Sequence, residues 1–103
     1  MLFVCTANMD RSPTAESIYK NHPGFDVKSA GISQYAKMPV SSKILEWADV
    51  IFCMENFQKS YILDKYPEVM VNKEIYNLNI PDDFIYREPE LISLIEERMK
   101  PWL

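Results

Sequence analysis

Cysteine is scarce in this chain, with two residues, Cys5 and Cys53, among 103. Two cysteines cannot form the disulfide framework of a small secreted domain, so we expect the reducing environment of the cytoplasm. Long apolar runs are also absent, and none approaches the roughly 20 residues that a membrane-spanning helix needs. The first residues lack the basic start, apolar stretch and cleavage site of a secretory signal. We therefore expect neither a disulfide-rich secreted fold nor a membrane partner.

Positive charge is in short supply as well, because 11 Lys and Arg face 15 Asp and Glu, for a net charge of −4. Nucleic-acid binding needs a basic surface, so we expect no nucleic-acid partner. A small anion site needs only local positive potential and stays compatible with this balance. The chain is 48% hydrophobic and 25% charged and has no repeat or linker, so residues 1–103 are expected to form a single domain.

Strand-like and helix-like segments alternate along the chain. Apolar or alternating runs predict strands at 1–5, 25–30, 49–54 and 73–78, and helical patterns lie at 12–22, 40–48, 55–66 and 89–103. This alternation predicts βαβ units and a parallel sheet with helices on both faces. Ligands of such sheets bind beyond the carboxyl ends of the strands. Cys5 ends the first predicted strand and the polar loop 79–83 follows the fourth, so we expect both at one edge of the sheet.

The loop between the first strand and the first helix has the composition of an anion site. Backbone N–H groups of such a loop, together with the helix N-terminus, attract a tetrahedral oxyanion and favour the thiolate form of a cysteine beneath it. Arg11 adds a planar fork that matches two phosphoryl oxygens, and the Ser12 hydroxyl can donate to the sulfur. The alternative interpretation is a buried core cysteine and a surface arginine, since cysteine is among the most buried residue types.

Four stretches of the sequence resemble the low-molecular-weight protein tyrosine phosphatases. VCTANMDRSPTAE (residues 4–16) is similar to their phosphate loop, in which a cysteine, five residues and Arg-Ser-Pro follow one another. KSAGIS (28–33) and WADVIFCME (47–55) resemble two further family landmarks, and NIPDDFIYREPEL (79–91) resembles the end of a short bacterial branch of predicted tyrosine phosphatases. The resemblance implies a three-layer α/β/α fold with a four-stranded parallel sheet, of the phosphotyrosine protein phosphatase I type, and residues 1–103 as one phosphatase-like domain.

The resemblance also implies a two-step hydrolysis. Cys5 attacks the phosphorus of a phosphomonoester, and water hydrolyses the resulting phosphocysteine. Arg11 and the loop amides hold the equatorial oxygens, Ser12 assists the departing thiolate, and Asn8 braces the loop. The implied phosphate-binding residues are Thr6, Ala7, Asn8, Met9, Asp10, Arg11 and Ser12. The implied substrate is a phosphotyrosyl protein or a small aryl phosphoester, with no metal or cofactor.

The family's general acid is an aspartate in the loop after the fourth strand. Asp82 and Asp83 are the candidates, and we favour Asp82 because an aromatic residue then lies close behind the acid, as in the family; a solvated carboxylate or a helix cap is the alternative role for either. Tyr35, Phe84 and Tyr86 lie where the family has aromatic walls around its substrate. Core packing for Phe84 and ordinary half-exposed positions for the two tyrosines remain the alternatives.

Two loop residues depart from the family pattern. Ala7 replaces a common glycine, which is acceptable at negative φ. Asp10 stands where relatives usually have cysteine or an apolar residue, and a carboxylate that faces inward would oppose a phosphate dianion. We expect it to face outward and to complement the helix N-terminus or pair with Arg11. Because of Asp10, an alternative function remains, namely a weak or inactive relic that binds phosphate or a phosphopeptide.

Arsenate reduction, which uses the same fold and loop, is a second alternative, but it needs two further cysteines.

Overall fold

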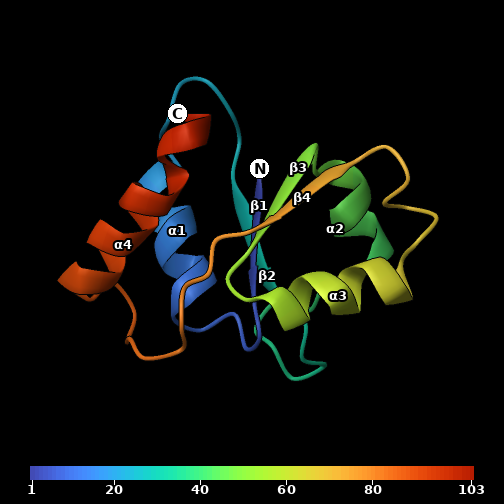
Figure 1. Ribbon diagram of the computed structural model, residues 1–103, viewed down its shortest axis with the longest axis horizontal. Coiled ribbons are helices and arrows are strands. Elements are labelled where there is room, and N and C mark those ends of the chain that lie inside the picture. Colours follow the sequence, from blue (N-terminus) through green and yellow to red (C-terminus); the bar gives the residue numbers. More distant parts are fainter.

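A computed structural model describes residues 1–103, and its centre is a four-stranded parallel sheet (Figure 1). The strands are β1 (Leu2–Cys5), β2 (Lys28–Gly31), β3 (Val50–Cys53) and β4 (Glu74–Asn77), in the order β2-β1-β3-β4. β1 and β3 are the inner pair and are almost wholly buried, as expected for strands covered on both faces. Four parallel strands therefore end at one edge of the sheet.

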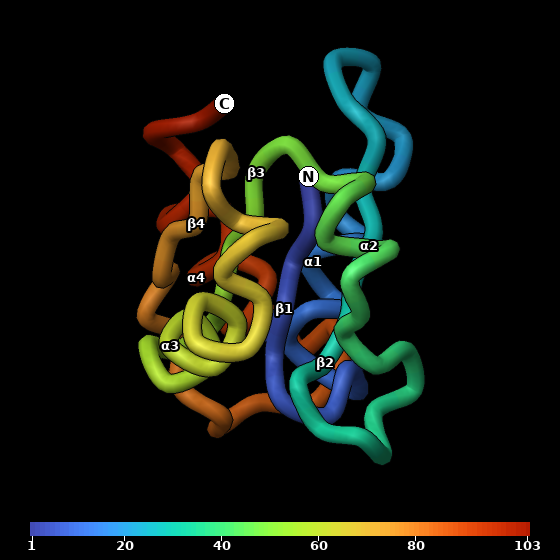
Figure 2. The backbone as a smooth tube through the Cα atoms, turned by 90° about the vertical axis from the view of Figure 1, so that its right-hand side faces the viewer, coloured from blue at the N-terminus to red at the C-terminus, as the bar shows by residue number.

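The helices form two layers, one on each side of this sheet. α1 (Arg11–Tyr19) and α4 (Pro89–Met99) lie on one side, and α2 (Ser42–Trp47) and α3 (Asn56–Lys65) lie on the other (Figure 1). Figure 2, turned so that the α2/α3 side faces the viewer, shows α2 and α3 in front of the strands and α1 and α4 behind them. A short 3-10 helix, Lys100–Trp102, follows α4. None of these helices combines the length and the apolar character needed to cross a membrane.

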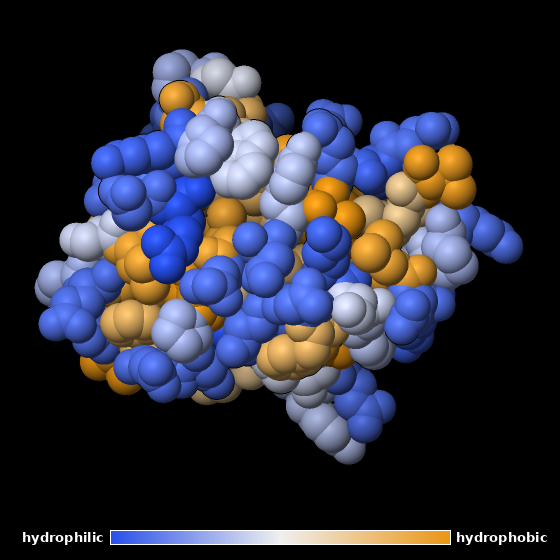
Figure 3. Space-filling model, viewed as in Figure 1, coloured by the Kyte–Doolittle hydropathy of each residue, from blue (hydrophilic) through white to orange (hydrophobic).

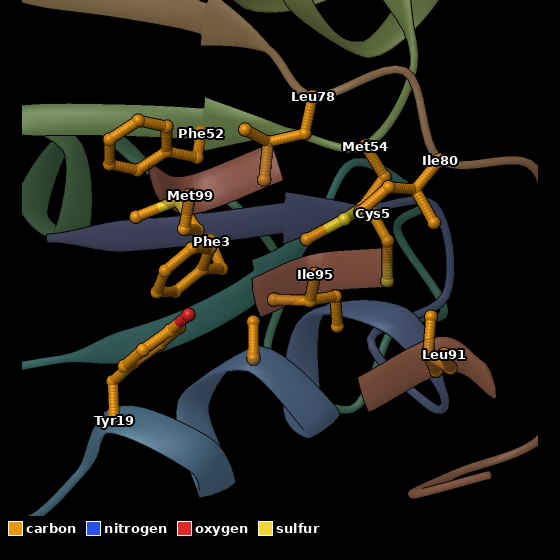
Figure 4. Close-up of a cluster of buried hydrophobic side chains, with 11 residues drawn as sticks. Phe3, Cys5, Tyr19, Phe52, Met54, Leu78, Ile80, Leu91, Ile95 and Met99 are labelled. Atoms are coloured by element: carbon orange, nitrogen blue, oxygen red, sulfur yellow. The ribbon is translucent and has the colours of Figure 1, made fainter. Parts of the chain in front are cut away.

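Each face of the sheet has its own hydrophobic core, because successive side chains of a strand point to opposite faces. Phe3 and Cys5 pack toward α1 and α4, whereas Leu2 and Val4 pack toward α2 and α3. The rings of Phe3 and Phe52 stack with their centroids 5.5 Å apart in the first core, and Cys5 lies at the same end of this core as Met54 and Ile80 (Figure 4). The surface in Figure 3 is mostly hydrophilic, with separate apolar patches.

Element boundaries differ from the sequence prediction by one or two residues at several ends and by more in two regions: α4 ends at Met99 rather than at residue 103, and the chain before β2 departs from both predicted elements. The predicted strand 25–30 begins later, at Lys28, and the first helix ends at Tyr19 rather than at His22. The reason is a local cluster before β2. The His22 ring stacks on Phe25 with a centroid distance of 4.3 Å, and its Nδ1 accepts a hydrogen bond from the Gly24 N–H at 3.0 Å. This cluster replaces a continuation of either element.

Candidate active site

The Cys5 thiol lies at the carboxyl end of β1, where the chain leaves the sheet and turns into α1. Cys5 is 3% exposed, and its Sγ lies 2.9 Å from Oγ of Ser12 and accepts a hydrogen bond from the Asn8 N–H at 3.2 Å. Ser12 Oγ also lies 3.2 Å from the Ala30 carbonyl, so its single proton has two acceptors within reach. The sulfur is thus held under the loop, next to a hydroxyl that can donate to it when it carries negative charge.

Asn8 is the residue that bends the loop. Its φ of 56° is left-handed, a conformation that asparagine tolerates better than most residues. Its Nδ2 donates to Oγ of Ser12 at 2.9 Å and to Oγ of Ser29 on β2 at 3.0 Å, and the Ser29 hydroxyl donates to Glu16 on α1 at 2.7 Å. A buried chain of hydrogen bonds therefore ties the loop to β2 and to α1. Ala7 does not have a positive φ, so the missing glycine causes no backbone strain.

The outer side of the loop is occupied by the segment that follows β2. Carbonyls of the loop accept hydrogen bonds from it, namely Cys5 O from Ile32 N, Thr6 O from Ser33 N, and Ala7 O from Lys37 N. The N–H groups of Thr6, Ala7, Met9 and Asp10 donate to no acceptor in the chain. With the carbonyls turned to the neighbouring segment, these amides are available to an anion above the sulfur.

The Arg11 guanidinium is almost fully buried, since the residue is 2% exposed, and it contacts two other loops at the same sheet edge. Nη1 donates to the Ile80 carbonyl at 2.8 Å and lies 3.0 Å from Oε2 of Glu55, which follows β3. Nε lies 3.6 Å from Oδ1 of Asp82, which follows β4. The arginine is therefore held in one orientation by groups from the segments that follow β3 and β4.

A pocket of about 120 Å³ opens above the sulfur. Its lining residues are Cys5, Thr6, Ala7, Met9, Asp10, Arg11 and Asp82. Of the two candidate acids, Asp82 borders this pocket, and its carboxylate is 68% exposed. Asp83 is exposed and does not line the pocket. Of the two aspartates, only Asp82 therefore lies at the pocket above the sulfur.

The three aromatic residues suggested as substrate walls do not line this pocket. Tyr35 is 87% exposed on the loop after β2, and Phe84 is half-buried against the core under α4. Tyr86 borders a neighbouring groove that it shares with Met9 and Lys37. The structure does not bring these rings together over Cys5, and their role toward a substrate stays a prediction.

Asp10 has a different partner from the two expected. Its carboxylate neither accepts a hydrogen bond from the first turn of α1 nor pairs with Arg11. Instead, Oδ1 accepts a hydrogen bond from the backbone N–H of Tyr86 at 2.9 Å, across 76 positions of sequence. The carboxylate therefore binds the segment that carries Asp82.

Glu55 and Gln58 belong to the surroundings of the site, although the sequence motifs did not single them out. Gln58 is fully buried; its Oε1 accepts from the N–H groups of Met54 and Glu55, and its Nε2 donates to Oγ1 of Thr6 at 3.2 Å. It thus joins the start of α3 to the phosphate loop. The position of Glu55 at the end of β3 was the available signal, because all parallel strands end at this edge.

The other cysteine does not take part in this arrangement. Cys53 faces the α2/α3 core, and burial raises the pKa of its thiol to about 12, so it stays protonated and unreactive. Nowhere do three or more histidine, cysteine, aspartate or glutamate side chains gather in a way that could hold a metal ion. The reactive groups of the site are a thiol, a guanidinium, a carboxylate and backbone amides.

Comparison with known proteins shows similarity to protein phosphatases. No protein-family model matches it. A relative in sequence is the protein-arginine-phosphatase of Geobacillus stearothermophilus, with 34% identity over 92 aligned positions that cover 66% of this chain and 62% of the relative. The chain thus spans less than two thirds of the length of this relative.

Solved structures resemble the fold over nearly the whole chain. A low molecular weight protein tyrosine phosphatase from Streptococcus pyogenes gives a TM-score of 0.80 at 18% identity, covering 99% of this chain and 89% of that protein. A protein tyrosine phosphatase from Entamoeba histolytica gives 0.73 at 26% identity, covering 94% and 89%. With the parallel sheet and its two helical layers, these likenesses confirm the predicted three-layer fold.

Proposed function

We propose that the chain is a member of the low-molecular-weight protein tyrosine phosphatase family and a phosphomonoester hydrolase that acts on phosphoproteins through a phosphocysteine on Cys5. The observation that carries this proposal is the position of the Cys5 sulfur under a loop of unpaired N–H groups, 2.9 Å from the Ser12 hydroxyl and in one pocket with Arg11 and Asp82. This arrangement supplies a nucleophile, a cradle for an oxyanion and a proton donor.

In the first step the Cys5 thiolate attacks the phosphorus of the bound phosphomonoester. The S–P bond forms as the P–O bond to the leaving group breaks, and protonated Asp82 gives its proton to the departing oxygen. The free amides of the loop and the Arg11 guanidinium hold the three non-bridging oxygens, which lie in the plane of the transition state. Because Arg11 is buried and held from three sides, little reorganisation accompanies this step.

In the second step water hydrolyses the phosphocysteine. The Asp82 carboxylate accepts a proton from the attacking water, the S–P bond breaks, and orthophosphate forms. The thiolate leaves with the electron pair of that bond, and the Ser12 hydroxyl donates to the sulfur as its charge grows. While the sulfur is bonded to phosphorus, the Ser12 hydroxyl can donate instead to the Ala30 carbonyl, which is 3.2 Å away.

The substrate class that we propose is the phosphotyrosyl protein, with small aryl phosphoesters as a simpler form of the same chemistry. A phosphoarginyl protein is the second candidate, supported by the 34% identity to a protein-arginine-phosphatase. In that case Asp82 would protonate the guanidinium nitrogen as the P–N bond breaks. Free, buried thiols at both cysteines fit the cytoplasmic location that we infer for the protein.

Arsenate reduction has less support from the site than hydrolysis. It requires two further thiols that can approach Cys5, whereas the chain has one further cysteine, Cys53, which faces the opposite side of the sheet. A relic that binds phosphate without turnover has the same loop, and it is an outcome of the test below.

The test compares hydrolysis of p-nitrophenyl phosphate, a phosphotyrosyl peptide and a phosphoarginyl peptide by the wild type and three variants. Cys5→Ser should abolish turnover, and Asp82→Ala should lower kcat about 10²–10⁴-fold. Cys53→Ala is the matched control, because it removes the other thiol on the far face and should leave kcat near the wild-type value. A wild type that binds orthophosphate but hydrolyses none of the three substrates would overturn the enzyme proposal in favour of the relic.

A further inference from the structure

The segment between β4 and α4 carries Asp82, and it contains no helix or strand of its own. Ile80 is fully buried, and Phe84 is half-buried against the core, whereas Asp82, Asp83 and Ile85 are exposed. Apolar packing therefore holds the segment on either side of the acid but not at the acid itself. The carboxylate itself lies 3.6 Å from Nε of Arg11, and the polar contacts of the rest of the segment complete its placement.

Those contacts come from the phosphate loop and the first two turns of α1. Arg11 donates to the Ile80 carbonyl at 2.8 Å at one end of the segment. At the other end Asp10 Oδ1 accepts from the Tyr86 N–H at 2.9 Å, and Thr14 Oγ1 accepts from the Arg87 N–H at 2.9 Å. The Arg87 guanidinium also donates to the Ser17 hydroxyl. The residues that cradle the phosphate and the segment that carries the acid are thus joined directly.

Asp10 and Thr14 are themselves hydrogen-bonded to each other and together bind the segment. The Thr14 hydroxyl donates to the Asp10 carbonyl at 2.6 Å, which places the two side-chain acceptors under consecutive amides of the segment. Arg87 has a φ of 59°, a conformation that a residue with a side chain adopts only when its surroundings require it. The turn at Tyr86 and Arg87 is therefore shaped by its two acceptors, Asp10 at the end of the phosphate loop and Thr14 on α1.

The Asp10 carboxylate needs an explanation, because a negative charge on the rim of an anion pocket weakens anion binding. It stands at the N-cap position of α1, but its side chain accepts no hydrogen bond from that helix, and it forms no ion pair with Arg11. Its one partner is the Tyr86 amide. A hydrogen bond from an amide to a carboxylate is stronger than one to a neutral acceptor, which is the benefit that offsets the charge.

We propose that Asp10 is a positioning residue that holds the Tyr86 backbone and thereby fixes Asp82 over the leaving-group side of the pocket. This inference rests on the proposed phosphatase function and adds to it a role for a residue that otherwise opposes phosphate binding. Asp10 does not touch the reacting atoms in this role. It acts through the segment 80–86. Loss of Asp10 should therefore lower kcat most for substrates whose leaving group needs protonation by the general acid.

The kinetic test uses two substrates that differ in this dependence. Phenyl phosphate has a basic leaving group and needs protonation, whereas p-nitrophenyl phosphate has a weakly basic one and needs it less. Asp10→Ala should lower kcat for phenyl phosphate about tenfold and kcat for p-nitrophenyl phosphate about twofold or less. Asp10→Asn keeps an oxygen acceptor and should restore most of the activity on phenyl phosphate. Asp64→Ala, which removes an exposed charge on α3, is the control for net charge and should match the wild type.

A double variant tests whether Asp10 acts through Asp82. Asp10→Ala combined with Asp82→Ala should be no slower on phenyl phosphate than Asp82→Ala alone, because the segment then has no acid to position. Equal losses on both substrates, or full additivity in the double variant, would overturn the proposal. So would an Asp10→Asn variant as impaired as Asp10→Ala, because the charge and not the acceptor would then matter.

A second measurement does not depend on turnover. Amide hydrogen exchange in residues 82–87 should be faster in Asp10→Ala than in the wild type and in Asp10→Asn, with exchange in β1 and β3 unchanged. If the wild type proves inactive, the proposed function fails, and this measurement still decides whether Asp10 holds the segment. Unchanged exchange at Tyr86 in Asp10→Ala would overturn the proposal even in an active enzyme.

Discussion

Arg11 and Glu55 form a pair at the floor of the site, with Nη1 of the buried arginine 3.0 Å from Oε2 of the half-buried glutamate. The pair joins the phosphate loop after β1 to the start of α3 after β3. A buried guanidinium without a partner is costly, so Glu55 supplies the anion that Arg11 needs while no phosphate is bound. We therefore expect the stability of the fold to depend on whether the pocket holds an anion.

Replacement of Glu55 should therefore destabilise the protein in a phosphate-dependent way. We expect Glu55→Ala to lower the free energy of unfolding by about 1–3 kcal/mol, because Arg11 loses a charged hydrogen-bond partner. Orthophosphate should raise the melting temperature of this variant more than that of the wild type, because the dianion then takes the place of the lost carboxylate. Glu90→Ala, an exposed acid on α4, is the control, and thermal unfolding with and without phosphate is the measurement. Equal phosphate shifts in all three proteins would contradict this role.

Gly31 should be indispensable for the shape of the phosphate loop. A Cβ at this position would lie 2.5 Å from the Thr6 carbonyl oxygen and 2.9 Å from the Asn8 nitrogen, which is closer than backbone atoms tolerate. Gly31→Ala should cost about 1–3 kcal/mol of stability and lower kcat/KM strongly, because the loop must shift away from β2.

The other glycine offers the matched control for this prediction. A Cβ at Gly24 would meet only atoms of the exposed His22 ring, the nearest at 3.2 Å. Gly24→Ala should leave kcat/KM unchanged and alter stability by less than about 0.5 kcal/mol. Denaturant unfolding and steady-state kinetics of both variants are the measurements, and a Gly31→Ala variant as active as Gly24→Ala would show that the loop can move without loss.

Asn8 combines two contributions that two variants can separate. Asn8→Gly loses the hydrogen bonds to Ser12 and Ser29, but glycine still adopts the left-handed conformation without strain. Asn8→Ala loses the hydrogen bonds and also disfavours that conformation. We expect Asn8→Ala to be less stable than Asn8→Gly by about 1 kcal/mol, the cost of a positive φ for a residue with a Cβ. Both should lower kcat, since Ser12 is no longer held beside the sulfur. Chemical unfolding and kcat test this, and equal stabilities would contradict the backbone contribution.

The Cys53 thiol should make stability fall at alkaline pH. Burial raises its pKa from 9.0 to about 12 in the folded protein, so above pH 9 the unfolded chain releases this proton while the folded chain keeps it. The contribution of this group to stability is complete below pH 9 and is lost as the pH rises toward 12, by at most about 1.4 kcal/mol per pH unit. Unfolding at pH 8 to 10 should show a steeper loss in the wild type than in Cys53→Ala. Parallel curves would contradict this pKa.

Much of the site was already visible in the sequence because its parts are local. Cys5, Asn8, Arg11 and Ser12 lie within eight consecutive positions between a strand and a helix, and the backbone path of such a loop brings them around one anion. The fourth predicted strand placed Asp82 at the same edge, since parallel strands end together. The layer order followed from the alternation of strands and helices.

Partners far apart in sequence were not predictable in the same way. The sequence determined that Asp10 is an acid in an anion loop, and from local rules it was expected to complement the N-terminus of the first helix or to pair with Arg11. Only the tertiary structure decided that its carboxylate binds the Tyr86 amide and that Glu55 neutralises Arg11. The physical reason is that β1, β3 and β4 end at one edge of the sheet, so the loops that follow them lie side by side. A side chain in one loop can therefore bind groups of another loop that are far away in the sequence. The order of residues in the sequence determined which reactive groups the site contains. The packing of the strands decided which loops contribute to that site.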